Sequence, residues 1–374
     1  MLPRYYNLAN IKQKNKVLVV YGPRRVGKTT LLNDFLAKTE LKYKIDSGDN
    51  IKTQEILASQ DFSKILAYAE GYELITIDEA QNIPNIGMAL KILVDKIPGI
   101  YVVVTGSSSF DLEQKIGEPL TGRKKTLILY PFSQIELLNV YNKQELQEKL
   151  TEFLIFGSYP EVFLAKTKKE KIAILNELVS SYLLKDVLNI EKIRGSFQLL
   201  NLLKLLAFQV GNEVSLSELA TQIKMDVKTV AKYLDILEKG FVIKRMGGFS
   251  RNLRQEITTK AKYYFLDNGI RNAVISQFND LNDRDDVGRL FENFVVMEKI
   301  KKDEYKESYG NLYFWRTYAG QEIDLIEDKD GQLRAFEIKW SQNFKKDAPK
   351  DWKKTYSESE YKVINRENYL EFLV

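Results

Sequence analysis

The sequence has 374 residues and contains neither cysteine nor histidine. Without cysteine it can form no disulfide, no thiolate nucleophile and no sulfur-ligated zinc site. Without histidine it can form no Ser-His-Asp triad, no imidazole base and no histidine-ligated zinc site. Any catalysis must therefore use carboxylates, hydroxyls, lysine and arginine. The metal that suits such oxygen ligands is a hard ion such as Mg²⁺.

Long apolar runs are also missing. The opening segment MLPRYYNLANIKQKNK lacks the apolar stretch of a signal peptide, and no later run is long enough to span a membrane. We therefore expect a cytoplasmic protein without membrane contact. Hydrophobic residues make up 44% of the chain, which is enough for folded cores, and the length favours two to four domains. The net charge of +5 is only mildly basic, so the distribution of charge must indicate whether nucleic acid is a partner.

A phosphate-binding motif follows the first apolar run. Residues 17–21 (VLVVY) have the composition of a buried parallel strand and lead into residues 22–29 (GPRRVGKT), which fit G-x-x-x-x-G-K-[ST] ahead of a helix-like segment over 30–37. In this setting the backbone N–H groups face phosphates, Lys28 neutralises the β- and γ-phosphates, and Thr29 offers its hydroxyl to Mg²⁺. The predicted nucleotide contacts are Gly22, Pro23, Arg24, Arg25, Val26, Gly27, Lys28, Thr29 and Thr30.

Two carboxylates end the next buried strand, which covers residues 74–77 (LITI). The carboxyl end of such a strand is where an open α/β sheet presents its ligand site. We predict that Asp78 joins Thr29 in the shell of Mg²⁺ and that Glu79 polarises the attacking water. A carboxylate in that position favours hydrolysis over transfer to another substrate.

Further hydroxyl and arginine candidates lie downstream. After the apolar residues 101–105 (YVVVT), Ser107 is our choice for contact with the γ-phosphate or the water, a plain serine-rich loop being the alternative. Arg123 is the single arginine between Arg25 and Arg194. Its planar guanidinium group suits a phosphoryl group in a neighbouring subunit of a homo-oligomer, with a surface salt bridge as the alternative.

The nearest match to the guanine-binding motif N-K-x-D, residues 142–145, lacks the final Asp, so ATP is favoured over GTP as the nucleotide.

The order of GPRRVGKTT, LITIDEAQ, VVVTGSSS and LTGRKKTLILYPFSQIEL resembles archaeal and bacterial AAA+-type ATPases that carry a C-terminal domain of unknown function. The resemblance implies an α/β protein with an AAA+-like parallel-sheet core over residues 1–132, a helical lid over 133–193, a winged helix over 194–275 and a restriction-endonuclease-like domain over 276–374. The family's lid motif corresponds to residues 157–160 (GSYP), with Ser158 in place of the second glycine. The lid region contains no arginine, although many AAA+ proteins use a lid arginine to sense nucleotide.

The middle of the chain has the pattern of a winged helix. Residues 215–218 (SLSE) form a capping box, and Asp226 caps a helix over 227–239 whose Lys228, Thr229 and Lys232 lie off its apolar stripe. We expect the following hairpin over 241–265 to contact DNA, with a connecting role as the alternative. Its charged residues are mostly basic: Lys244, Arg245, Arg251, Arg254, Lys260 and Lys262 against Glu256.

The last quarter gathers carboxylates and a lysine. Strand alternation around a turn at 328–331 (DKDG) brings Asp324, Glu337 and Lys339 together. This is similar to the D…E-x-K arrangement of restriction-endonuclease-like nucleases, in which two carboxylates hold Mg²⁺ and the lysine orients the attacking water. Glu292, in a helix-like segment over 290–301, matches the acid that those folds often add as a ligand. A solvated strand face, or a fold that binds nucleic acid without cleaving it, is the alternative.

These patterns predict an ATP-hydrolysing protein that acts on DNA and has a Mg²⁺-dependent nuclease site. The alternative is a nucleotide-switched DNA-binding or regulatory ATPase whose nuclease-like domain is inactive. A signalling ATPase with protein partners forms a third class.

Overall fold

The computed structural model describes residues 2–107, 119–183, 196–250, 260–344 and 347–374. The chain divides into two compact units. We call Arg4–Tyr130 with Lys239–Phe241 the N-terminal unit, and Pro131–Glu238 with Val242–Val374 and the first three residues the C-terminal unit.

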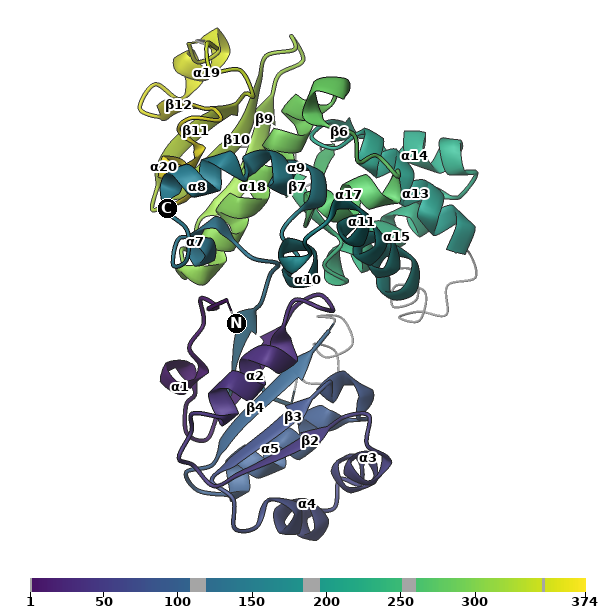
Figure 1. Ribbon diagram of the computed structural model, residues 1–374, viewed down its shortest axis with the longest axis vertical. Helices are drawn as coiled ribbons and strands as arrows, with labels where there is room; N and C mark the ends of the chain where they lie inside the picture. Colours follow the sequence, from purple (N-terminus) through teal and green to yellow (C-terminus); the bar gives the residue numbers. More distant parts are fainter. Residues whose placement is uncertain (1, 108–118, 184–195, 251–259, 345–346) are drawn as a thin grey trace. The chain divides into compact units, whose positions relative to one another are not determined.

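The N-terminal unit is built on a parallel sheet. Its five strands have the order β2-β3-β4-β1-β5 (Figure 1). Because all of them run the same way, their carboxyl ends share one edge, where the loops that follow β1, β3 and β4 meet. The predicted α/β core is confirmed. The elements are α1 (Leu8–Ile11), β1 (Val17–Tyr21), α2 (Lys28–Leu36), β2 (Tyr43–Ser47), α3 (Ile51–Ala58), α4 (Phe62–Ala69), β3 (Leu74–Asp78), α5 (Ile86–Lys96), β4 (Tyr101–Gly106) and β5 (Lys124–Ile128).

Both faces of the central strands are buried, which explains the continuous apolar runs of β1, β3 and β4. Alternate residues of each strand, such as Val19, Ile77 and Val104, pack into one core with α3, α4 and α5. The intervening residues, such as Val20 and Val103, are equally buried on the other face. The sheet is therefore fixed from both sides, and so are the positions of the loops at its carboxyl edge.

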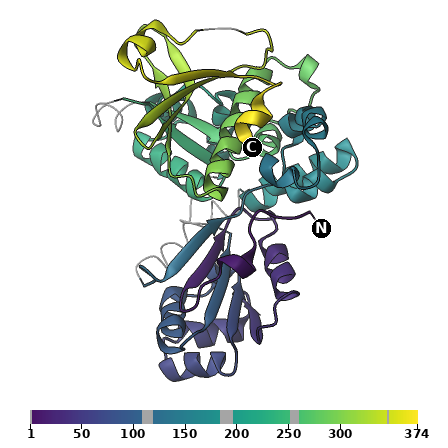
Figure 2. The same ribbon diagram turned by 90° about the vertical axis from the view of Figure 1, so that its left-hand side faces the viewer.

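The C-terminal unit contains a helical part and two sheets. The antiparallel sheet has the order β6-β8-β7, and the mixed sheet has the order β12-β11-β10-β9, in which β12 runs parallel to β11 (Figures 1 and 2). The helices are α7 (Gln134–Leu137), α8 (Lys143–Glu148), α9 (Leu150–Phe156), α10 (Pro160–Leu164), α11 (Lys168–Glu177), α13 (Ser196–Phe208), α14 (Leu216–Ile223), α15 (Val227–Lys239), α17 (Asn268–Val274), α18 (Val287–Tyr305), α19 (Lys350–Thr355) and α20 (Tyr369–Leu373). The strands are β6 (Glu213–Val214), β7 (Ile243–Gly247), β8 (Ala261–Phe265), β9 (Asn311–Arg316), β10 (Glu322–Lys329), β11 (Gln332–Ile338) and β12 (Glu360–Ile364).

Helix α15 begins where its sequence signal places it. Asp226 accepts a hydrogen bond from the backbone N–H of Thr229 at 2.9 Å, and Lys228 and Lys232 are exposed. The Thr229 hydroxyl also bonds to Asp226, at 2.5 Å, so it belongs to the helix cap rather than to a free outer face. Of the basic residues of the expected wing, Arg251 and Arg254 lie outside the described residues, as does Glu256.

The three segments expected as lid, winged helix and nuclease-like domain fall within one compact unit. The boundary expected at residue 132 lies close to the junction of the two units at Tyr130 and Pro131. Within the C-terminal unit, α9 packs on α17 and α18, and α18 also packs on β8 and β11 (Figure 2). Helix α18 thus contacts all three segments, whose division into separate domains stays a prediction.

The expected lid motif packs on the start of α17. Gly157 has a positive φ of +72°, and a Cβ atom at this position would overlap the carboxylate of Asp267. The backbone N–H of Ser158 donates to the same carboxylate at 2.7 Å. Glycine is therefore required at position 157 for both its backbone conformation and its close contact.

We predict that Gly157→Ala destabilises the C-terminal unit by roughly 2–6 kcal/mol, since its backbone (φ +72°, ψ −158°), in a region essentially restricted to glycine, adds about 1–3 kcal/mol and the overlap about 1–3 kcal/mol. Gly331→Ala is the matched control, because Gly331 has a φ of +76° with nothing near its Cβ position, and it should lose only the backbone part. Urea unfolding followed by tryptophan fluorescence measures this directly, because Trp315, Trp340 and Trp352 all lie in the C-terminal unit. Equal losses in the two variants would contradict the packing role of Gly157.

Candidate functional site

The glycine-rich loop after β1 is held against its own sheet. Gly22 approaches the backbone carbonyl of Leu129 so closely that a Cβ atom would overlap it. Helix α2 begins at Lys28, whose buried ammonium group donates to the carbonyl oxygens of Gly22 at 3.0 Å and Pro23 at 2.9 Å. The lysine thus lies inside the loop at the start of a helix, which is the arrangement that binds phosphate.

Arg4, near the start of the chain, holds the same loop in place through hydrogen bonds. Its guanidinium donates to the carbonyl oxygens of Val26 and Tyr130, both at 2.5 Å. The rigid fork of arginine can hold two acceptors at once, so Arg4 joins the loop to the end of β5. Nothing in the local sequence around Arg4 indicates this contact, because its partners follow 22 and 126 residues later.

The proposed Mg²⁺ ligands lie in contact at the carboxyl edge of the sheet. The hydroxyl of Thr29 donates to Asp78 Oδ2 at 2.7 Å. The other oxygen, Oδ1, accepts a hydrogen bond from the hydroxyl of Thr105, which in turn accepts from the backbone N–H of Glu79 at 3.1 Å. A hydroxyl and a carboxylate together are a donor set that fits Mg²⁺. Sequence reasoning missed Thr105, which precedes the chosen Ser107 by two residues.

Glu79 and Ser107 are joined by a second residue that sequence reasoning missed. The amide nitrogen of Gln81 donates to Glu79 Oε2 at 2.5 Å and to Ser107 Oγ at 3.1 Å. Glu79 itself has a left-handed backbone, with φ of +51°. Such conformations in non-glycine residues cluster at functional sites. The structure therefore brings Thr29, Asp78, Glu79 and Ser107 together at one edge of the sheet.

Arg123 does not join this group. It precedes β5, and Lys124 lies beside Val17 at the start of β1, whereas the phosphate-binding loop follows the other end of β1. Arg123 therefore lies at the amino edge of the sheet. There its half-exposed side chain forms an ion pair with Asp95 at 2.6 Å. This geometry separates Arg123 from the nucleotide loop of its own chain.

A second cluster of charged residues lies on the hairpin of β10 and β11. Leu325 lies opposite Phe336, which brings Asp324, Glu337 and Lys339 together. The ammonium group of Lys339 lies 3.0 Å from Asp324 Oδ2 and 3.1 Å from Glu337 Oε1. Burial lowers the pKa of Lys339, but the two carboxylates raise it by more, so that the lysine stays protonated.

Glu292 reaches the same cluster from α18. Its Oε1 accepts a hydrogen bond from the Tyr264 hydroxyl at 2.8 Å and lies 3.3 Å from the ammonium group of Lys262. Lys262 also lies 4.0 Å from Asp324 Oδ1. Burial raises the pKa of Glu292 to about 7. For Lys262 burial lowers the pKa, but Glu292 and Asp324 outweigh it, and the pKa lies above its usual value. Sequence reasoning placed Lys262 on a DNA-facing wing and missed this position.

Four of these side chains, Lys262, Glu292, Asp324 and Lys339, border a cavity of about 260 Å³. Residues from the turn before β6, from β8, from α18 and from the mixed sheet line it, so both expected domains of this region contribute. Its charged lining residues are evenly divided between acids and bases: Glu213, Glu292, Glu322 and Asp324, and Lys262, Arg289, Arg316 and Lys339.

The carboxylates of this cluster do not converge as a triad. Throughout the described ranges, no three acidic side chains form a group that could hold a metal ion. Instead, one lysine lies between Glu292 and Asp324, and another lies between Asp324 and Glu337. The residues present therefore fit a cation shared by two carboxylates, and not one held by all three.

Much of the positive charge expected on the wing is neutralised within the C-terminal unit. Lys244 pairs with Glu238 at 2.9 Å, Lys260 lies 3.9 Å from Glu213, and Lys262 is buried against Glu292. The physical reason is that β8 belongs to a sheet packed against α18 and is not a free hairpin. In the described part of the wing, the basic excess is therefore smaller on the surface than in the sequence.

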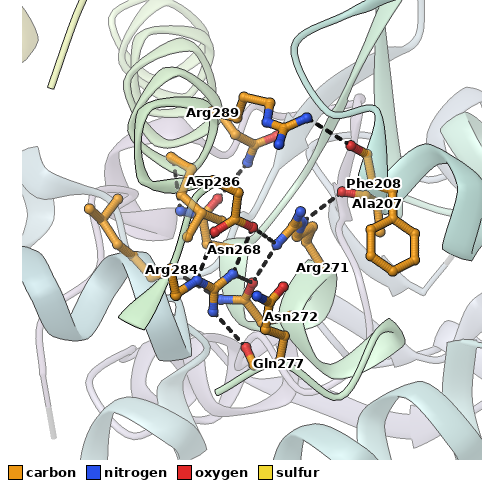
Figure 3. A network of polar contacts seen from close by, with 12 residues as sticks. Ala207, Phe208, Asn268, Arg271, Asn272, Gln277, Arg284, Asp286 and Arg289 are labelled. Atoms are coloured by element: carbon orange, nitrogen blue, oxygen red, sulfur yellow. Dashed lines mark hydrogen bonds and ion pairs between the residues drawn. The ribbon is translucent and has the colours of Figure 1, made fainter. Parts of the chain in front are cut away.

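A buried network supports one wall of the cavity (Figure 3). Asp286, which precedes α18, pairs with Arg271 at 2.5 Å and with Arg284 at 2.8 Å. Arg271 also donates to the carbonyl of Ala207 at 2.8 Å, and the lining residue Arg289 donates to the carbonyl of Phe208 at 3.2 Å. The network thus fixes the start of α18 against the end of α13.

No helix within the described segments is long and apolar enough to cross a membrane.

Among the comparisons with known proteins, the N-terminal segment has the most informative match. Residues 14–138 match a family model described as an AAA domain. Residues 147–281 and 287–371 match two models that are each described as a domain of unknown function, DUF8612 and DUF4143. The expected order of an ATPase domain followed by domains of unknown function is confirmed at this level.

The relatives are themselves uncharacterized. A protein of Haemophilus influenzae is 27% identical over 359 residues, which cover 88% of this chain and 85% of that protein. A protein of Mycobacterium tuberculosis is 25% identical over 328 residues, which cover 86% of this chain and 70% of that protein. Among solved structures, the Walker-type ATPase of Pyrococcus abyssi is 15% identical with a TM-score of 0.47, covering 70% of this chain and 91% of that chain.

For the ATP hydrolysis expected from the sequence, we predict that Thr105→Val lowers turnover at least about tenfold, because small displacements of catalytic groups carry losses of this order. The change removes the hydroxyl that orients both Asp78 and the backbone of Glu79. Thr76→Val is the matched control, since this buried hydroxyl on β3 bonds only to the strand carbonyl of Lys44, at 3.0 Å, among the contacts that the structure gives it. Both variants should lose a similar amount of stability, about 1–3 kcal/mol, and only the first should lose activity. Equal turnover in both would contradict the role of Thr105.

Proposed function

We propose that the N-terminal unit binds ATP with Mg²⁺ and hydrolyses it. The observation that carries this proposal is the chain of contacts from Thr29 through Asp78 to Thr105 and the backbone of Glu79, at the edge where the glycine-rich loop opens. It places oxygen ligands, a buried lysine and a carboxylate together beside the first turn of α2. The AAA-domain match over residues 14–138 supports the same interpretation.

In this proposal each residue has a definite role. Residues 22–30 surround the phosphates with backbone N–H groups, and Lys28 exchanges its two carbonyl partners for phosphate oxygens. Mg²⁺, held by Thr29 and Asp78, would neutralise charge that develops on the phosphates. Glu79 orients a water and takes its proton as the oxygen attacks the γ-phosphorus. The bond from that phosphorus to the bridging oxygen breaks, giving ADP and phosphate. Gln81 holds Glu79 and Ser107 in place.

We further propose that the C-terminal unit acts on DNA. Helices α13 to α15 with β7 and β8 form the winged helix, whose exposed Lys228 and Lys232 face phosphates. The mixed sheet with α18 forms the restriction-endonuclease-like domain. Asp324 and Glu337 would hold one Mg²⁺, and Lys339 would orient the water that attacks the phosphorus of a phosphodiester as one of its ester P–O bonds breaks and the alcohol leaves. The juxtaposition of these three side chains supports cleavage.

A specific observation favours the alternative of DNA binding without cleavage. Every carboxylate of the cluster already faces a lysine, and the three acids do not converge. A site of this kind can bind a polynucleotide through its cations after losing catalysis. The two candidates therefore differ in whether a divalent ion displaces Lys339 from Asp324 and Glu337.

ATP hydrolysis is tested with Lys28→Ala and Glu79→Gln. We expect Lys28→Ala to lose ATP binding, and Glu79→Gln to bind ATP while its turnover falls by roughly 10²–10⁴-fold. Phosphate release and the binding of a fluorescent ATP analogue separate the two effects. Glu73→Gln, an exposed change just before the amino end of the same strand β3 and so at the edge opposite Glu79, serves as control. Undiminished turnover in Glu79→Gln would contradict the assignment of the base.

DNA cleavage is tested with labelled single- and double-stranded DNA in the presence of Mg²⁺ and ATP. We expect wild type to cut, and Asp324→Asn to bind DNA without cutting it, because the shared ligand of the cation is lost. Asp328→Asn at the far end of β10 is the control. Binding without cutting by wild type would establish the alternative candidate. Cutting that survives Asp324→Asn would show that the site lies elsewhere.

Arg123 is tested for a role between subunits. Because it lies at the amino edge of its own sheet, we propose that it completes the nucleotide site of a neighbouring subunit in a homo-oligomer. Arg123→Ala and Glu79→Gln should each be inactive alone, and a mixture should regain ATP turnover in mixed assemblies. Asp95→Asn, which breaks the ion pair but keeps the arginine, should stay active. If Asp95→Asn fails as badly as Arg123→Ala, the ion pair itself is what matters.

A further inference from the structure

We propose that Lys262 permanently fills one of two cation positions in the C-terminal site, and thereby limits that site to a single divalent cation held by Asp324 and Glu337. The proposal deepens the proposed C-terminal site and rests on it for the cation at Asp324 and Glu337. It also gives Glu292 a different role, because Glu292 then positions Lys262 and does not bind the metal.

The two lysines mark two places where one cation is shared between two carboxylates. Lys339 lies between Asp324 and Glu337, at 3.0 Å and 3.1 Å. Lys262 lies between Glu292 and Asp324, at 3.3 Å and 4.0 Å. Asp324 belongs to both pairs and uses a different oxygen for each. A divalent ion with oxygen ligands would suit either place if its lysine withdrew.

Only one of these lysines is able to withdraw. The side chain of Lys339 is 31% exposed, so its flexible stem can move off the two carboxylates toward the cavity that it lines, where its ammonium group stays hydrated and beside the water that it would orient. The side chain of Lys262 is only 4% exposed, and its ammonium group lies 5.5 Å from the centre of the Phe314 ring. Moving it would separate the buried carboxylate of Glu292 from its ion-pair partner, which is strongly unfavourable. The position between Asp324 and Glu337 therefore opens, and the other stays filled.

The fixed lysine comes from outside the mixed sheet. Lys262 and Tyr264 are alternate residues of β8, so they project from the same face of that strand, and both contact Glu292. Gly211 leaves room for the carboxylate of Glu292, because a Cβ atom there would lie only 3.0 Å from its Oε2. The site is thus completed by the antiparallel sheet, and residues 276–374 alone lack one of its cations.

The fixed position of Lys262 predicts how many metal ions take part when a phosphodiester binds. Two-metal sites use one ion at the attacking oxygen and one at the leaving oxygen. Here a fixed ammonium group stands in the second place, so a phosphate entering the cavity meets one exchangeable ion and one built-in charge. The class of ligand remains a phosphodiester, and the number of ions bound with it is one.

The test counts bound Mn²⁺ in the full-length, nucleotide-free protein by electron paramagnetic resonance. All variants carry Asp78→Asn, which removes the carboxylate ligand of the N-terminal site. We expect one Mn²⁺ in this background, none after Asp324→Asn, and one of unchanged affinity after Glu292→Gln. Lys262→Met should gain a second Mn²⁺ or bind at least about tenfold more tightly, since ligand-sphere changes alter metal affinity by about 10–100-fold.

The double change Lys262→Met with Glu292→Gln is the matched control. It keeps Lys262 absent but removes the carboxylate that would hold the new ion, so it should return to one Mn²⁺. Tryptophan fluorescence checks that each variant is folded. Because Glu292→Gln leaves Lys262 in place, it tests the assignment even if Lys262→Met does not fold.

Three results would overturn the proposal: two Mn²⁺ in the background protein, loss of Mn²⁺ in Glu292→Gln, or a folded Lys262→Met that binds as before. Failure of the proposed nuclease function has a different signature. In that case the background protein binds no Mn²⁺, while Lys262→Met gains one that the double change removes, and the role of Lys262 stands.

Discussion

The buried charged and polar side chains of α18 each need a partner, and they find it in different segments of the C-terminal unit. Glu298 accepts from the backbone N–H of Gln134 at 2.7 Å, and Lys301 donates to the carbonyl of Phe132 at 3.2 Å. Glu292 pairs with Lys262 of β8. Removing one partner of a buried charge typically costs about 3–5 kcal/mol. Lys299 pairs with Glu327 of β10 at 2.5 Å, so these partners join the helical segment, the antiparallel sheet and the mixed sheet to α18 in one unit.

The same constraint holds the segments expected as lid, winged helix and nuclease-like domain within one compact unit, and their division into separate domains stays a prediction. Local patterns predicted the elements well: α15 begins after Asp226, and a turn follows β10. Which charges would be buried depends on contacts between segments far apart in the chain. Lys262 was expected on a surface hairpin, because its partner Glu292 comes 30 residues later and no local pattern links the two. Of the buried charged cluster, the alternation of residues along a hairpin predicted only the juxtaposition of Asp324, Glu337 and Lys339.

In the nucleotide site, too, local motifs were predictable from the sequence, and contacts between distant segments were not. The phosphate-binding loop and Asp78 were predictable because each belongs to a motif of a few consecutive residues, and parallel strands bring their carboxyl ends to one edge. The residues that hold these groups in position were not. Thr105 bonds to Asp78 from the next strand, and Arg4 reaches the loop from the start of the chain. Arg123 was singled out as the one arginine of its stretch, but only the register of β5 shows that it lies at the opposite edge of the sheet.

The central claim concerns where a divalent ion binds in the C-terminal unit, and the most direct measurement is a crystal structure of the full-length protein with Mn²⁺, located by anomalous scattering. Our account predicts one Mn²⁺ between Asp324 and Glu337, with Lys339 displaced and Lys262 still between Glu292 and Asp324. A Mn²⁺ bound to Glu292, with Lys262 displaced, would contradict it.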